Sequence, residues 1–516
     1  MFWSWTMNMT TTELMNVSVL SPVCLAPMAL APTRWMDRVY AGQNAKGLVP
    51  QALAGLGLLG ALASPLWLLK EQPGGTTGLV MPGGLTAIML PFVALLTLVV
   101  LRYSIVYLHG QARRGRFIKW LCATSAAVQV LVITANLLVF VLAWMTMSLA
   151  LHQLLTYFGD RPGAQIAARK KFIFSRIGDL CLITTLALVW HSCRTWQMPV
   201  IFHLAAGRPG AHASLAAAGL LIVIAALLKS AQFPFHTWLP DTMEAPTPVS
   251  AFMHAGIINA GGFLVLRMSQ LVVLWPVNQW VLLVIGGLTA VGASLVMLTQ
   301  TSVKRSLGFS TVAQMGFMMF ECGLGAWSLA LLHIIAHGIY KAYAFLSSGK
   351  APASTTTPHT QTISLRHHGF ALAVCGALVI FWLWLSRQWP DANPALAGVI
   401  AMGIVVLGWQ LAIRARNALA VASALLLPAL VLLLHCLLSR LLLTTVGGAA
   451  DLNASVSLAQ LLAVLALLAL PGAVELAARL RPHSPLVQRL YVHVYNGFYL
   501  NPLANRLVMA LWPAQA

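Results

Sequence analysis

Runs of about twenty apolar residues recur along this 516-residue chain, and they limit its fold more than any other feature. Nearly all of them are long enough to cross the roughly 30 Å of hydrocarbon in a bilayer as a helix. A lipid-facing backbone must satisfy its own hydrogen bonds, which excludes an open sheet, and the alternation of a membrane barrel is absent. The predicted spans are 45–55, 78–101, 118–135, 137–157, 171–191, 214–232, 248–270, 279–299, 305–323, 325–347, 369–386, 395–413, 417–438 and 456–473. With a weaker run near 17–31, the sequence predicts an all-α polytopic integral membrane protein of about fourteen or fifteen transmembrane helices.

Composition supports a single transmembrane domain over residues 1–516. Hydrophobic residues make up 59% of the chain and charged residues 8%, whereas soluble domains carry about 25% charged residues. The sequence contains neither a Walker loop nor a GxGxxG motif between a strand and a helix, so we expect no ATP or NADH chemistry and no cofactor. Seven scattered cysteines include no CxxC pair, which predicts neither a disulfide framework nor a metal site. The N-terminus has no basic region and no convincing cleavage site, so we expect no removable signal.

The net charge of +20 comes largely from short basic loops between spans. The stretches 109–119 and 161–171 are separated by two spans and therefore lie on the same side, which the positive-inside rule assigns to the cytoplasm. This pattern predicts a multi-pass protein of the bacterial inner membrane that contacts anionic lipids, and it gives no support to nucleic-acid binding. The loops could also form a basic cytoplasmic surface that docks a soluble subunit, although plain positive-inside topology explains them equally well. The residues of that surface would be Arg113, Arg114, Arg116, Lys119, Arg169 and Lys170.

The stretch from Leu227 to Gly256, LLKSAQFPFHTWLPDTMEAPTPVSAFMHAG, concentrates polar residues within apolar surroundings. Lys229 ends an apolar run, and Pro234 and three further prolines interrupt the helix behind it. Irregular backbone at membrane depth survives only beside protein or a hydrated cavity, and broken helices are typical of ion transporters. The alternative is that Lys229 extends to the lipid headgroups. Asp241 and Glu244 are candidate supporting carboxylates.

A second polar group follows in LLHIIAHGIYKAYAF. His333, His337 and Lys341 stand at i, i+4 and i+8, which places them on one face of a helix. Because a lysine at the bilayer centre costs about 2.5–3.5 kcal/mol, this stripe should face a bundle interior or a hydrated path, where such groups form proton relays. The alternatives are a structural polar seam and metal binding by the histidine pair, for which no suitably spaced third ligand is present.

Four further residues are candidates because of their neighbours. His254 follows the predicted break and could join the relay, although a lone histidine is more often a satisfied core residue. Arg176 and Asp179 stand at i and i+3 and could pair locally, and Asp179 could also tune a nearby lysine. Lys304 opens another apolar run, where an interface anchor is the first interpretation and membership of the relay the second.

The sequence resembles the proton-translocating antiporter-like subunits, which include subunit L of respiratory complex I and subunits of sodium/proton antiporters. KSAQFPFHTWLPDTMEAPTPVSAFMHA, VKRSLGFSTVAQMGFM and LLHIIAHGIYKAYAFLSSG carry the resemblance, which covers roughly residues 100–350. It implies about fourteen transmembrane helices with two inverted five-helix repeats and broken helices. It also implies that Lys229 is the central proton-bearing lysine and that His254 and the residues of the stripe occupy relay positions.

The chain departs from that family in four places. Met145 follows Trp144 where the family commonly has a glutamate that modulates the lysine, and Glu321 in MMFECGLG is an unusual acid that could compensate. AGVIAMGIVVLGWQLAIRAR offers no lysine at the interior position of the second repeat. We also expect no long lateral helix of the kind that subunit L possesses after the terminal YVHVYNGFYLNPLANRL.

These departures make the chain most similar to one branch, the DabB-type membrane subunits of inorganic-carbon accumulation complexes. That resemblance implies a subunit that translocates H⁺ or Na⁺ and is not itself an enzyme. Its partner would be a large cytoplasmic zinc-containing subunit similar to carbonic anhydrase, which hydrates carbon dioxide. The competing interpretations are a proton-pumping subunit of a respiratory NADH-quinone oxidoreductase or cation/proton antiporter, and a non-conducting scaffold.

Overall fold

A computed structural model describes residues 11–40, 47–69, 80–159, 161–207, 212–349 and 483–512, together with isolated residues between 373 and 477. The chain divides into two compact units. The first contains residues 1–323, 333–348 and 483–516, and the second contains 324–332 and 349–482. The predicted spans 369–386, 395–413, 417–438 and 456–473 lie almost entirely outside the described residues, as does the AGVIAMGIVVLGWQLAIRAR stretch.

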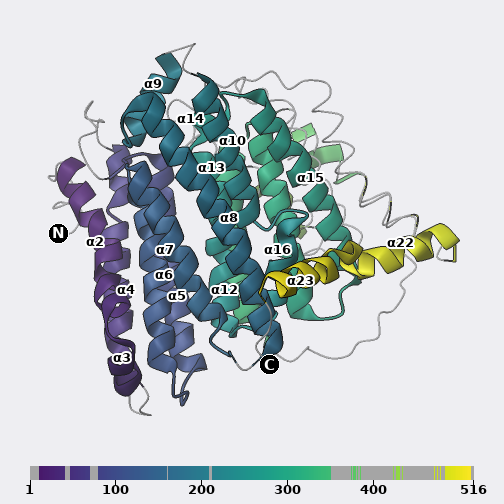
Figure 1. Ribbon diagram of the computed structural model, residues 1–516, viewed down its shortest axis with the longest axis horizontal. Helices are drawn as coiled ribbons and strands as arrows, with labels where there is room; N and C mark the ends of the chain where they lie inside the picture. The colour runs from purple at the N-terminus through teal and green to yellow at the C-terminus, as the bar shows by residue number, and fades with distance from the viewer. Residues whose placement is uncertain are drawn as a thin grey trace. The chain divides into compact units, whose positions relative to one another are not determined.

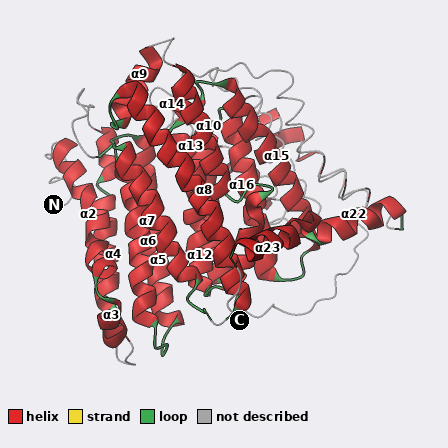
Figure 2. Cartoon of the chain, viewed as in Figure 1, coloured by secondary structure: helices red, strands yellow, loops and turns green. Residues whose placement is uncertain are grey.

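The described part of the chain is built from helices joined by loops and turns (Figure 2). Its only strand-like pairs there are two isolated bridges, Val80 with Thr134 and Asn136 with Gln197. The N-terminal elements are α2 (Thr11–Leu30), α3 (Thr33–Tyr40), α4 (Leu48–Ala61), η1 (Ser64–Leu69), α5 (Gly84–Tyr107), α6 (Arg114–Ile133), α7 (Leu137–Leu155), α8 (Pro162–Cys193), α9 (Met198–Gly207) and α10 (His212–Lys229).

Shorter segments follow α10 before long helices resume. These are η2 (Phe235–Thr237), α11 (Trp238–Asp241), η3 (Thr242–Glu244), α12 (Thr247–Ala255), η4 (Ile257–Asn259), α13 (Ala260–Arg267) and α14 (Ser269–Val272). The remaining described elements are α15 (Pro276–Thr299), α16 (Val303–Gly323), α17 (Trp327–Leu346), α22 (Pro485–Tyr495), η5 (Gly497–Tyr499) and α23 (Leu500–Leu511).

Within the described ranges, nine helices are long and apolar enough to cross a membrane. A tenth, Ala213–Lys229, is apolar but shorter. This agrees with the predicted all-α membrane architecture, while the expected total of about fourteen extends beyond the described residues. Figure 1 shows that the α5–α6 and α7–α8 connections lie at the same end of the helices, as the two basic loops predicted. We call this the basic end of the first unit, and the other the opposite end.

Close packing fixes the long helices of this unit against one another. Gly286, Gly316 and Gly323 let α15 and α16 approach closely, since a Cβ added at Gly316 would lie 2.5 Å from the backbone nitrogen of Ala290. Asn136 caps α7 by accepting hydrogen bonds from the backbone N–H groups of Leu138 (2.9 Å) and Val139 (3.2 Å). The region around Lys229 is therefore held by helices with defined separations.

The C-terminal helices α22 and α23 differ from the spans because they run across them (Figure 1). The ring of Phe498 in η5 packs against Phe233 at a centroid distance of 6.5 Å. The Trp512 ring packs against Phe172 of α8 at 5.7 Å. The C-terminal segment thus packs against other helices of the first unit, close to the interruption that follows α10.

Candidate functional site

The helix containing Lys229 is broken directly after that residue. Ala231 adopts a left-handed conformation with φ of 52°, and Pro234 cannot donate a backbone hydrogen bond. From Ser230 to Pro246 the chain forms only the short segments η2, α11 and η3, and then α12 begins with Pro248 in its first turn. The proline-rich stretch therefore produces the predicted broken helix, and Lys229 is the last residue of α10 before the break.

A second interruption was not predicted. The expected continuous span 248–270 is divided into α12, η4 and α13. The change occurs at Gly256, immediately beyond His254, where φ is −119° and ψ is −66°. His254 therefore sits at the end of a short helix instead of in the middle of a long one.

The ammonium of Lys229 lies inside the first unit, so it does not extend to lipid headgroups. The side chain is 7% exposed, and its Nζ lies 5.0 Å from the ring centre of Trp144 on α7. Among the described residues, Nζ has no hydrogen-bond partner. Its electrostatic neighbours are Asp179 and Arg176 on α8. The face of an indole attracts a cation, which favours the ammonium at this place.

Asp179 is the carboxylate that acts on this lysine. Its Oδ2 lies 2.6 Å from a guanidinium nitrogen of Arg176, and its side chain is buried. The charges of Lys229 and Lys171 also act on it. Met145 leaves α7 without the family's glutamate, and the neighbouring helix α8 supplies a carboxylate to the same lysine.

Lys171 completes a charge cluster that we define as Lys171, Arg176, Asp179 and Lys229. Its buried ammonium donates to the backbone carbonyl oxygen and to the hydroxyl of Ser148, the latter at 2.9 Å. Sequence reasoning treated this lysine only as the end of a basic loop. Because the cluster contains three cationic side chains and one carboxylate, the protons carried by its lysines decide its net charge.

The three residues of the His–Lys stripe lie on α17, and each has a buried neighbour. His333 Nδ1 lies 3.0 Å from Glu321 Oε2 on α16. The rings of His333 and His337 meet edge to face with centroids 6.1 Å apart. Lys341 Nζ donates to the carbonyl oxygen of Leu307 at 3.2 Å.

His254 connects α12 to this stripe. Its ring stacks on Phe345 at a centroid distance of 4.4 Å, and its Nδ1 lies 3.0 Å from the Thr311 hydroxyl. Electrostatic interactions link it to Lys341 and His337. The structure thus brings His254 together with the stripe, and it places Glu321 beside His333 instead of Lys229. The idea that Glu321 replaces the missing glutamate at Lys229 is therefore wrong.

Two predicted supporting residues lie apart from these groups. Lys304 donates to the hydroxyl of Thr247 at 3.1 Å and so joins the starts of α16 and α12. Glu244 pairs with Arg161 at 3.4 Å, with side chains that are 50% and 54% exposed. The Glu244 contact is a surface ion pair of the kind that contributes little to stability.

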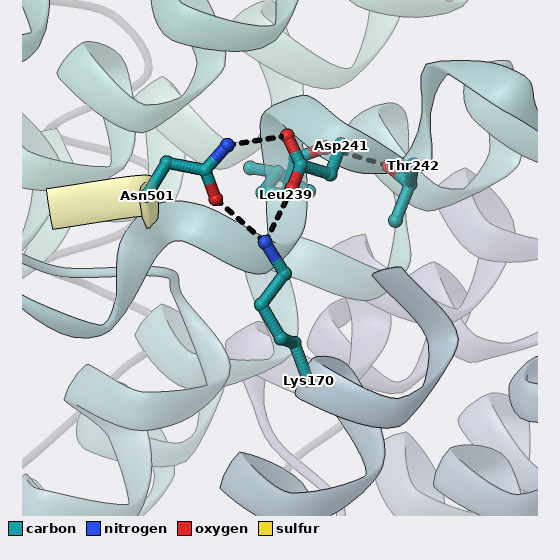
Figure 3. A network of polar contacts seen from close by, with 5 residues as sticks. All are labelled: Lys170, Leu239, Asp241, Thr242 and Asn501. Atoms are coloured by element: carbon teal, nitrogen blue, oxygen red, sulfur yellow. Dashed lines mark hydrogen bonds and ion pairs between the residues drawn. The ribbon is translucent and has the colours of Figure 1, made fainter. Parts of the chain in front are cut away.

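Asp241 instead belongs to a polar network that the sequence did not reveal (Figure 3). Lys170 Nζ forms an ion pair with Asp241 Oδ2 and donates to Asn501 Oδ1 at 2.6 Å. Asn501 in turn donates from Nδ2 to Asp241 Oδ1 at 3.1 Å. This Lys170–Asp241–Asn501 network joins α8, the broken connection and α23.

The network corrects the expected basic surface. Lys170 is completely buried, and so is Arg114, whose guanidinium donates to the carbonyl oxygen of Ile105 at 2.7 Å. Lys170 was placed on a loop because span 171–191 was expected to begin after it, whereas α8 already begins at Pro162. Among the described residues, no three His, Cys, Asp or Glu side chains are grouped as metal ligands.

The comparisons with known proteins agree with this architecture. A family model described as "NADH:quinone oxidoreductase/Mrp antiporter, TM" matches residues 134–427. The chain is 36% identical over 450 residues to the probable inorganic carbon transporter subunit DabB2 of Halothiobacillus neapolitanus, covering 83% of this chain and 80% of that protein. It is 39% identical over 326 residues to the probable inorganic carbon transporter subunit DabB of Hydrogenovibrio crunogenus, covering 62% of this chain and 63% of that protein.

The fold is also found among solved structures. One is the structure of the Mrp complex from Dietzia sp. DQ12-45-1b, with a TM-score of 0.55 and 22% identity, covering 98% of this chain and 58% of that one. Residues 134–427, which the family model matches, include Trp144, the charge cluster, the broken connection, His254 and the His–Lys stripe. The chain therefore belongs to the NADH:quinone oxidoreductase/Mrp antiporter family of multi-pass, cation-translocating membrane subunits.

Proposed function

We propose that the chain is the H⁺- or Na⁺-translocating membrane subunit of an energy-coupled complex that accumulates inorganic carbon across a bacterial inner membrane. The observation that carries the proposal is Lys229, a buried ammonium at the end of a broken helix, 5.0 Å from the Trp144 ring centre and attracted electrostatically by the Asp179 carboxylate. A buried charge within a membrane protein is energetically costly. Ionisable residues that are retained there commonly line ion pathways, which favours a transport role for Lys229. The similarity to subunits named as probable inorganic carbon transporter subunits supports the substrate class.

The relay begins in the charge cluster and continues through His254 to the His–Lys stripe. A lysine and a neutral imidazole can each take up and release a proton, whereas arginine cannot release one. His254, His337 and Lys341 act on one another electrostatically. A proton that arrives at one of these groups therefore changes the affinity of the next for its own proton.

Asp179 sets the charge balance at the start of this route. It pairs with Arg176 at 2.6 Å, and the charge of Lys229 also acts on it. If the Asp179 carboxylate shifts toward Arg176, it attracts the Lys229 ammonium less strongly, and the reverse also holds. The proton affinity of Lys229 consequently depends on the arrangement of the Arg176–Asp179 pair, which gives the missing glutamate at position 145 a functional substitute.

The carbon chemistry belongs to a partner in this proposal. The partner is a large cytoplasmic zinc-containing protein similar to carbonic anhydrase, which would convert carbon dioxide to bicarbonate. The present chain supplies the ion gradient and is not the enzyme. Basic side chains on the cytoplasmic side, such as Arg113 and Arg116, would steer association and make it sensitive to salt.

Growth of a carbonic-anhydrase-deficient host in ordinary air tests the proposal. We expect rescue when the chain is coexpressed with its neighbour-encoded partner, and no rescue by the chain alone. Lys229→Ala should insert at the wild-type level and abolish rescue, and Lys229→Arg should fail as well because arginine does not release its proton. Rescue by the Lys229→Ala variant would contradict the relay. Rescue by the single chain would contradict the division of labour.

The alternative function is a proton-pumping subunit of an NADH-quinone oxidoreductase or a cation/proton antiporter. The family description itself includes both classes of complex, and this observation favours keeping the alternative. Copurification from native membranes separates the two. Recovery of quinone-reducing subunits would support the alternative, whereas recovery of a zinc-containing cytoplasmic protein supports the carbon-accumulation complex.

A further inference from the structure

Glu321 and His333 form a buried carboxylate–imidazole pair outside the region of Lys229. Glu321 Oε2 and His333 Nδ1 are 3.0 Å apart, and their side chains are 2% and 11% exposed. The His333 ring also lies 5.8 Å from the ring of Phe317. A buried carboxylate normally requires a partner that satisfies it, and here that partner is a group that itself takes up protons.

The pair lies near the opposite end of the first unit. The helix α16 begins at Val303, and its first turns meet α12 through Lys304 and Thr247. Glu321 stands eighteen residues after Val303, which places it about 27 Å farther along the helix and two residues before the end at Gly323. Because α5 and α7 end at the basic end, the intervening antiparallel spans place the end of α16 away from the basic loops (Figure 1).

The His–Lys stripe leads directly to this pair. Lys341 and His333 are eight residues apart on α17, which corresponds to about 12 Å along the helix axis. His337 lies between them, its ring 6.1 Å from that of His333. Neither ring nitrogen of His337 has a hydrogen-bond partner among the described residues. His337 is therefore free to bond on either side.

We propose that Glu321 and His333 form the proton-exchange site at the end of the relay that faces away from the basic loops. The ligand of this site is the proton itself, shared between a carboxylate and an imidazole. This inference rests on the proposed function. It assigns a transport role to Glu321, a residue outside the relay positions implied by the resemblance, and it defines where the transported proton meets the far side of the membrane.

The transfer can be followed atom by atom. A proton that reaches Nε2 of a His333 ring carrying its hydrogen on Nδ1 produces an imidazolium. The Nδ1 proton then passes to Glu321 Oε2, which leaves a neutral ring with its hydrogen on Nε2 and a neutral carboxylic acid. Release of that proton on the far side restores the carboxylate. Exchange of the remaining ring proton from Nε2 to Nδ1 through a water molecule restores the first tautomer, so each cycle moves one proton, and the reverse sequence carries a proton inward.

Other titratable groups near the pair must be separated from it in any test. Within the described ranges, His337 and Lys341 on α17 act on this region, and His254 acts on His337. Cys322 on α16 is buried beside Glu321 and interacts electrostatically with the Glu321 carboxylate. Glu321→Gln keeps the shape of the side chain and removes both its negative charge and its ability to exchange a proton, which makes it the sharpest probe.

The experiment measures proton flux in sealed membrane vesicles that contain the full complex, with the pH varied on one face at a time. In the wild type, flux should depend on the pH of the face remote from the basic loops. Glu321→Gln should lower flux about tenfold or more and abolish this dependence. The dependence on the pH of the other face should remain. Asp37→Asn is the matched control, because the Asp37 carboxylate accepts from the backbone N–H of Arg116, which an asparagine can still satisfy.

His333→Gln and Glu321→Asp complete the set. His333→Gln retains a hydrogen bond to Glu321 but cannot shuttle a proton, so we expect the same loss. Glu321→Asp keeps the carboxylate and should restore part of the pH response, which a purely structural role would not predict. Wild-type flux and pH response in Glu321→Gln, with flux abolished in Lys229→Ala, would overturn the exchange site alone. Undiminished flux in Lys229→Ala would overturn the proposed function instead.

Discussion

The Lys170–Asp241 pair offers a quantitative test of how the broken connection is held in place. The Lys170 side chain is 0% exposed and that of Asp241 is 22% exposed. Removing one partner of a buried ion pair costs about 3–5 kcal/mol, because the remaining charge is left desolvated. Asp241→Asn leaves the buried ammonium without a counter-charge. We expect it to lower the free energy of unfolding by about 3 kcal/mol, the lower end of that range, since asparagine still offers an amide oxygen.

Lys170→Met should lower the free energy of unfolding less than Asp241→Asn does. The Asp241 carboxylate that remains is partly exposed and still accepts a hydrogen bond from Asn501 at 3.1 Å. We expect a loss of about 1–2 kcal/mol. The double variant Lys170→Met/Asp241→Asn removes both charges together. Its cost should be at least about 1 kcal/mol smaller than the sum of the two single costs, since residues in direct contact are not additive.

A surface ion pair provides the control. Glu244→Gln breaks the ion pair with Arg161. The side chains of Glu244 and Arg161 are 50% and 54% exposed, so the free energy of unfolding should change by less than about 1 kcal/mol. The assay is reversible unfolding of the purified full chain in mixed micelles with SDS as denaturant, followed by tryptophan fluorescence. Equal effects of Asp241→Asn and Glu244→Gln, or strictly additive single variants, would refute the view that the buried pair secures the connection.

Three further changes test the packing around the relay. Asp179→Asn should lower ion flux about tenfold or more at unchanged membrane abundance, because Lys229 and its arginine neighbour lose their shared carboxylate; flux normalised to protein in the same vesicles checks this. Gly316→Leu should destabilise the protein by about 1–3 kcal/mol or more, since a Cβ there already lies 2.5 Å from a backbone nitrogen of α15, whereas Gly55→Leu, which meets nothing within 4 Å, should have little effect on unfolding. Ala231→Gly should leave stability unchanged or raise it by up to about 1 kcal/mol, because it relieves a left-handed alanine worth about 1–2 kcal/mol and loses one buried methyl worth about 0.8 kcal/mol; a clear loss of unfolding free energy would contradict this reasoning.

The apolar runs predicted most of the described spans because a membrane helix is specified by length and hydrophobicity alone. The break after Lys229 was also predictable, since proline removes a backbone donor wherever it occurs. The second break at Gly256 was not, because a single glycine in an apolar run carries no comparable signal. The resemblance contributed the expected relay roles, and those roles remain predictions.

Long-range polar pairing accounts for what the sequence could not predict. Lys170 and Asn501 are 331 residues apart in the chain and form a hydrogen bond in the structure. The positive-inside rule counts the charges near a span and says nothing about their burial, so Lys170 was assigned to an exposed loop. Glu321 was recognised as an unusual acid, but its partner His333 could be identified only once α16 and α17 were placed.

The buried carboxylates of the described residues give the proposed relay a direction. Among those residues only Asp179 and Glu321 are both acidic and buried. Asp179 lies with the lysines and arginine of the charge cluster, whereas Glu321 lies with a histidine at the far end of α16. A carboxylate beside a guanidinium that never releases its proton acts mainly as a fixed counter-charge. A carboxylate beside an imidazole shares a proton that either group can release. With methionine at position 145, the acidic function of the family's glutamate is therefore divided in our proposal between a residue that balances charge at Lys229 and a residue that exchanges protons at the other end of the route.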